Sequence, residues 1–103
     1  METIISGGPF VAWQGVNNEK ILFVLLPTPF SNYLAEPWGG LLIVTTRPDH
    51  SDPEILETDD LRRDLAQLSA RIGGKHVFWR SEKDARDRQK VKQDLGKSPR
   101  YIG

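Results

Sequence analysis

Two continuous apolar runs limit the folds open to this chain. Residues 21–26 (ILFVLL) and 41–46 (LLIVTT) contain no charged side chain. Their length and β-branched content favour strands over helices. An unbroken apolar run is typical of a strand covered on both faces. We therefore expect residues 21–26 to form a central strand and residues 41–46 to pair directly with it.

Shorter segments predict further strands. Residues 10–13 (FVAW) have strand composition, and residues 15–18 (GVNN) tolerate the positive φ of a tight turn, so residues 10–13 and 20–26 are expected to form a hairpin. Residues 3–5 and 75–79 have similar composition. The sheet should then contain four to five strands.

A helix is expected in the middle of the chain. Residues 51–54 (SDPE) have the capping-box form with proline in the first turn, which indicates a helix start. From residue 58 onward, leucine and isoleucine recur at spacings of four, three and four, which places them on one face of a helix. This apolar stripe, expected to cover the sheet, consists of Leu61, Leu65, Leu68 and Ile72.

A second helix is expected at residues 82–95, after a start signal at residues 81–84 (SEKD). Its only apolar residues are Ala85, Val91 and Leu95, so it buries little surface by itself. The fold class is therefore α+β, with a mostly antiparallel sheet, one amphipathic helix and a charged C-terminal helix. We expect a single domain at residues 1–95 and a flexible tail at residues 96–103.

Charge divides the neutral chain into two parts. Residues 1–74 hold five Lys and Arg against ten Asp and Glu, whereas residues 75–103 hold nine against four. The net charges are thus −5 and +5, a division typical of a basic segment that meets an acidic partner or a nucleic acid. The chain has no cysteine and no apolar run near the roughly 20 residues of a membrane span. We expect a cytoplasmic protein with no membrane contact.

The connection at residues 27–40 is a candidate binding loop. It is rich in proline and glycine, and it carries Phe30, Tyr33 and Trp38. Loops beyond roughly 12 residues without secondary structure are often functional, and aromatic side chains supply contact area to interfaces. The alternative is a compact loop whose aromatic residues cover one end of the sheet.

The basic C-terminal third is a second candidate surface. Arginine and aromatic side chains are enriched in interfaces, and both kinds occur here. The alternative is a solvated helix whose cations pair with interleaved Glu82, Asp84, Asp87 and Asp94. A further alternative is self-association, in which the basic C-terminal third of one chain docks on the acid-rich residues 49–64 of the same chain or of a second copy. The residues that we expect to contact a partner are Trp79, Arg80, Arg86, Lys90 and Arg100.

Catalytic and metal motifs have less support. Asp49, His50, Asp52 and Glu54 follow a buried strand and have the ligand types of a divalent metal site. The capping signal at residues 51–54 explains most of them without a metal. His76 on a predicted strand is typical of a structural histidine. The sequence contains no nucleophile elbow and no phosphate-binding glycine loop.

We therefore predict a small interaction module, with no catalytic residues and no cofactor, that binds a protein partner or a second copy of itself. The first alternative is a nucleic-acid-binding protein that uses the basic third. The second is a divalent-metal-dependent hydrolase.

Overall fold

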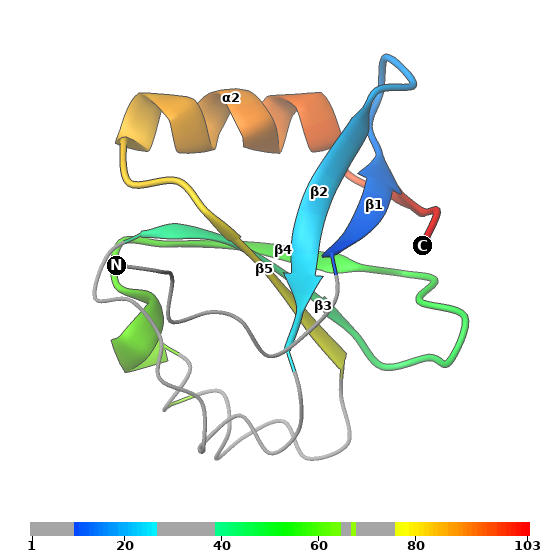
Figure 1. The fold of residues 1–103 in the computed structure, drawn as a ribbon, viewed down its shortest axis with the longest axis horizontal. Coiled ribbons are helices and arrows are strands. Elements are labelled where there is room, and N and C mark those ends of the chain that lie inside the picture. The colour runs from blue at the N-terminus through cyan, green and yellow to red at the C-terminus, as the bar shows by residue number, and fades with distance from the viewer. Residues whose placement is uncertain (1–9, 27–38, 65–66, 68–75) are drawn as a thin grey trace.

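A computed structural model describes residues 10–26, 39–64, 67 and 76–103. These residues form a six-stranded antiparallel sheet with the order β4-β3-β5-β2-β1-β6, and a helix lies across one face (Figure 1). The chain is thus α+β, as the sequence predicts. The elements are β1 (Phe10–Gln14), β2 (Lys20–Leu25), β3 (Gly40–Thr45), β4 (Glu54–Thr58), β5 (His76–Ser81), α2 (Ala85–Leu95) and β6 (Arg100–Tyr101).

The core occupies both faces of the sheet. On β3, Ile43 packs in the cluster that contains Leu95 of α2, and Leu42 packs in the cluster that contains Leu61. Alternate residues of a strand point to opposite faces, so a strand buried on both sides needs apolar residues at every position. This requirement explains the unbroken apolar sequence of β3, in which every residue is buried.

The predicted hairpin is confirmed. β1 and β2 pair from Phe10 opposite Val24 to Gln14 opposite Lys20. Asn18, in the turn between them, has a φ of 62°, the left-handed conformation that asparagine tolerates better than most residues. β2 is an interior strand, but Leu22 on it is 50% exposed.

The predicted neighbour of β2 is wrong. β3 does not pair with β2, because β5 lies between them and pairs with both. Trp79 of β5 stands opposite Val24 of β2 on one side and Leu42 of β3 on the other. β5 contains the fully buried Val77 and Phe78. A strand with side chains this large on both faces is best enclosed between two other apolar strands.

The helix start predicted at residues 51–54 is also wrong. Residues 54–58 form β4, which pairs with β3 along its full length. Ile55 packs against the cluster on the α2 side, whereas Leu56 packs against the opposite cluster. Only an extended chain directs two adjacent side chains into opposite layers. Pairing with β3 therefore overrides the local capping signal.

A helix begins later, at residues 61–64. The Asp60 carboxylate accepts a hydrogen bond from the backbone N–H of Arg63 at 3.1 Å, the contact of an N-capping residue. Leu61 is fully buried on the face opposite α2. The other members of the predicted apolar stripe, and the predicted strand at residues 3–5, lie outside the described residues.

Helix α2 is capped by Asp84, whose side chain accepts a hydrogen bond from the N–H of Arg86 at 2.7 Å. Ser81, the expected cap, is instead the last residue of β5. The chain continues beyond α2 into β6, which pairs with β1 at Trp13 and Gln14. Residues 96–103, expected to form a tail, thus contribute a strand to the sheet.

Candidate functional site

Trp79 is part of the core. Its side chain is 1% exposed and lies in the cluster with Leu42 and Val77. The expectation that it contacts a partner is therefore wrong for the folded chain. The reason is the position of β5 at the centre of the sheet, which buries both of its faces.

Arg80 makes contacts within the chain. Its Nε donates to Glu82 at 3.0 Å, and its Nη1 donates to the backbone carbonyl of Leu22 at 3.0 Å. The Arg80 side chain is one-third exposed. These bonds tie the end of β5 to β2, so Arg80 has a structural role.

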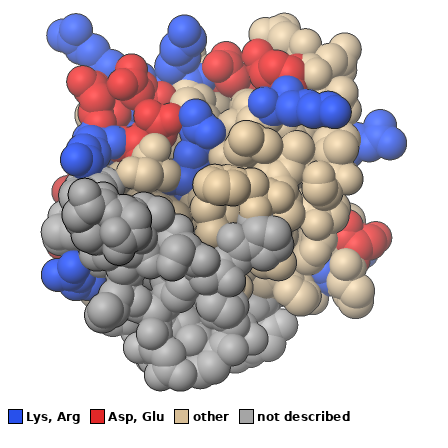
Figure 2. Space-filling view, in the orientation of Figure 1, with Lys and Arg blue, Asp and Glu red and all other residues tan. Residues whose placement is uncertain are grey.

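Three other predicted contact residues, Arg86, Lys90 and Arg100, are exposed. Arg86 and Lys90 are four residues apart on α2, on the face opposite the fully buried Leu95. Exposed Asp84 and Asp87 lie close to them in the chain. Figure 2 shows cationic and anionic side chains interleaved along the upper edge, where Figure 1 places α2. The surface of this helix is mixed in charge.

The aromatic residues Phe30, Tyr33 and Trp38 of the predicted binding loop lie outside the described residues. Their role as partner contacts stays a prediction.

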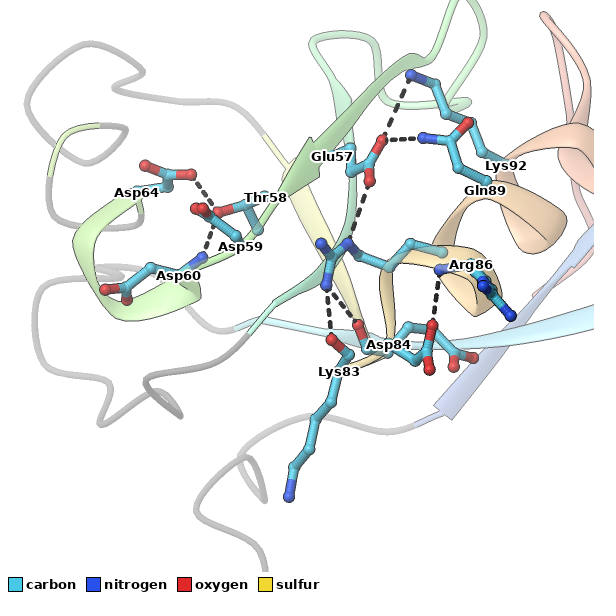
Figure 3. Close-up of polar contacts among 12 residues, drawn as sticks. Glu57, Thr58, Asp59, Asp60, Asp64, Lys83, Asp84, Arg86, Gln89 and Lys92 are labelled. Atoms are coloured by element: carbon cyan, nitrogen blue, oxygen red, sulfur yellow. Dashed lines mark hydrogen bonds and ion pairs between the residues drawn. The ribbon is translucent and has the colours of Figure 1, made fainter.

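One basic side chain, Arg88, holds α2 to the edge strand β4. Arg88 is 8% exposed, and its Nε donates to the Glu57 carboxylate at 3.1 Å. Its Nη1 donates to the carbonyls of Glu82 and Lys83 at 3.1 and 2.9 Å. The second Glu57 oxygen accepts from Gln89 at 2.6 Å, and Figure 3 shows Glu57 pointing toward the helix.

This ion pair was missed by the sequence analysis. Arg88 and Glu57 are 31 residues apart, and the helix contains other cations with the same local pattern. A signal would have been available only if residues 54–58 had been recognised as a strand. Glu57 then shares a face with Ile55, two positions earlier, and that face lies toward α2.

The predicted acidic metal cluster does not form. Asp52 pairs with Arg47 at 3.5 Å, and Asp49 accepts a hydrogen bond from the N–H of Ser51 at 3.0 Å. That backbone bond lowers the pKa of Asp49. Glu54 lies exposed on β4. Within the described ranges, no group of three or more His, Cys, Asp or Glu side chains could hold a metal ion.

The fourth member of that predicted cluster, His50, instead contacts His76. Their ring centroids are 4.9 Å apart, and the planes cross at 87°. His50 also contacts the rings of Phe78 and Tyr101, and its Nδ1 lies 2.9 Å from Thr45 Oγ1. Burial is the main cause that lowers the pKa of His50, and His76 adds to the effect.

Large apolar side chains are exposed on the β1–β2–β6 side of the sheet. Phe10 is 70% exposed, Leu22 50% and Ile102 41%. Leu22 stands opposite Ala12 in the β1–β2 ladder, and Phe10 precedes Ala12 by two positions, on the same face. The N–H of Ile102 donates to the Ala12 carbonyl at 2.9 Å. We refer to Phe10, Leu22 and Ile102 as the outer patch.

The comparisons with known proteins give no relative: no family model matches the chain, and neither the curated proteins nor the solved structures contain a significant match. Among the described residues, no helix has both the length and the apolar character required to cross a bilayer.

Proposed function

We propose that this protein is a small non-enzymatic interaction module that binds another protein chain, and that its simplest partner is a second copy of itself. The observation that carries the proposal is the outer patch. Its three large apolar side chains lie on neighbouring backbone segments of one sheet. Contiguous exposed apolar groups of this kind mark interaction sites more often than scattered single residues do.

Charged residues would surround such a contact. Arg86, Lys90 and Arg100 are exposed, and arginine is enriched in interfaces because its guanidinium supports both stacking and paired hydrogen bonds. The proposal retains the aromatic loop with Phe30, Tyr33 and Trp38 as a further contact. The proposal also includes three earlier expectations. They are an amphipathic helix after residue 58 that covers the sheet, a charged C-terminal helix, and a cytoplasmic location.

Light scattering over a range of protein concentrations tests the proposal. The wild type is expected to form a dimer, and the double variant Phe10→Ser/Leu22→Ser is expected to be a monomer, because it loses most of the apolar area in the outer patch. Val16→Ser is the matched control, since Val16 is 62% exposed but lies in the β1–β2 turn. A wild type that stays monomeric at every concentration would remove self-association. A double variant that dimerises like the control would remove the outer patch as the interface.

Nucleic-acid binding through the basic C-terminal third is supported by its exposed cations, among them Arg86, Lys90 and Arg100. Phosphate contacts by Arg86 and Lys90 would make the affinity fall steeply with salt. Nearby Asp84 and Asp87 oppose such contacts. Filter binding to single-stranded oligonucleotides at low and high salt separates the alternatives. Retention at low salt that is lost in Arg86→Glu/Lys90→Glu would favour nucleic acid over a protein partner.

A further inference from the structure

The two histidines of the chain meet beside Phe78, on the face of the sheet that packs against α2, although they are 26 positions apart in sequence. The register of β3 and β5 places Thr45 directly opposite His76. The chain then turns, with the N–H of His50 donating to the carbonyl of Arg47 at 2.9 Å, and His50 returns over the end of β3. Backbone pairing and a tight turn thus bring the two imidazoles together.

We propose that His50 and His76 form a two-imidazole binding site for a divalent transition-metal ion of the zinc or copper type. Imidazole nitrogen is a preferred ligand of these ions, whereas magnesium and calcium prefer oxygen. The site is independent of the outer patch and of the partner proposed above.

The separation of the two rings fits one shared ion. A metal–nitrogen bond of about 2.1 Å places the centres of two imidazoles on one ion roughly 4.5–5.5 Å apart. The observed 4.9 Å lies inside this interval. His76 is exposed at the start of β5, so its ring can rotate to direct a nitrogen toward the ion. Water completes the coordination on the open side.

Thr45 orients one of the ligands. Its hydroxyl lies 2.9 Å from His50 Nδ1 and is fixed, because Thr45 is 1% exposed. When Nδ1–H donates to this oxygen, the lone pair of the ring is left on Nε2, the atom that binds the metal. Such outer-shell hydrogen bonds typically fix the tautomer of a ligating histidine.

The surroundings also favour a neutral His50. Its ring rests on Phe78 and Tyr101, with centroid distances of 5.1 and 4.5 Å. Burial disfavours the charged form of this imidazole and lowers the pKa of His50.

Isothermal titration of the untagged chain with zinc chloride at neutral pH tests the site. We expect one zinc ion per chain in the wild type. Because the protein supplies only two ligands, His76→Gln and His50→Gln should each weaken binding by at least tenfold. Thr45→Val should weaken it by roughly 10-fold or more, the usual cost of losing an outer-shell partner. Magnesium chloride should give no binding heat.

A spectroscopic readout locates the ion. Zinc should shift the side-chain NMR signals of His50, His76 and Tyr101 in the wild type. The exposed His76 can be replaced without loss of core packing, so His76→Gln stays informative if His50→Gln fails to fold. Wild-type protein that shows no shift at millimolar zinc would overturn the proposal. A His76→Gln variant that binds zinc as tightly as the wild type would also overturn the proposal.

Discussion

Arg88 of α2 and the half-buried Glu57 of β4 form an ion pair at 3.1 Å that fastens the helix to the edge of the sheet. The Arg88 guanidinium donates to Glu57 and to two backbone carbonyls that precede the helix, all within the chain. A basic residue in the most charged segment of the chain therefore acts within the fold. Removing one partner of such a pair leaves the other charge without compensation.

Arg88→Ala should lower the free energy of unfolding by about 2–4 kcal/mol, because the partners that remain to Glu57 among the described residues are Gln89 and a Lys92 amine 4.0 Å away. Arg86→Ala is the matched control on the exposed side of the same helix, and it should change stability by less than about 0.5 kcal/mol. Urea denaturation measures both. Equal effects of the two substitutions would show that the ion pair adds nothing.

Gly40 is expected to tolerate no side chain. A methyl group there would overlap the carbonyl oxygen of Arg80 and the ring of Trp79 on the neighbouring strand. Neither group can move without disturbing the β3–β5 ladder. Gly40→Ala should therefore cost about 2 kcal/mol or more. Thermal unfolding compares Gly40→Ala with the wild type, and equal Tm values would contradict the expected clash.

Acid should destabilise the protein through His50. Burial lowers the folded-state pKa of this imidazole below its unfolded value near 6.5, so the unfolded chain binds more protons. The stabilising contribution is complete above about pH 6.5 and is lost as the pH falls through the folded-state pKa. His76 adds to the lowering of the His50 pKa, and Asp49 opposes it.

Urea denaturation at several pH values between about 7.5 and 5 measures this loss, and His50→Gln should flatten the profile. His76→Gln removes only the smaller cause, so it should leave most of the slope. An unchanged slope in His50→Gln would assign the acid sensitivity to other groups, such as the carboxylates.

Local patterns in the sequence predicted individual strands better than they predicted which strands lie next to each other. The β1–β2 hairpin was predictable because its partners are joined by a short turn that contains Asn18. The position of β5 between β2 and β3 was not predictable, because the sequence of an apolar strand does not specify which strands lie next to it. The helix signal at residues 51–54 did not produce a helix, because the five residues from 54 to 58 pair with β3 instead. The energy of this pairing depends on β3, which lies outside the short window that carries the helix signal.

The candidate sites show the same division. The exposure of Arg86 and Lys90 follows from helical periodicity alone. The burial of Arg88, two residues after Arg86, depends on where Glu57 meets the helix. The contact of His50 with His76 depends on the register of β3 and β5. An alignment of the β3 and β5 sequences as paired strands would have placed Thr45 beside His76. Such an alignment requires knowing that these two strands are neighbours.

Tyr101 should stabilise the domain although only two residues follow it in the sequence. Its ring packs edge-on against Trp13 at 5.4 Å and against His50 at 4.5 Å. Tyr101→Ala should cost about 2–3 kcal/mol through lost burial and lost aromatic contacts. Arg100→Ala, an exposed neighbour in the same strand, should cost less than about 0.5 kcal/mol. Hydrogen exchange gives a second measurement, since the amides of Ile102 and Gly103 donate to the Ala12 carbonyl. Fast exchange at both amides, with a neutral Tyr101→Ala, would instead support the flexible tail that the sequence predicts.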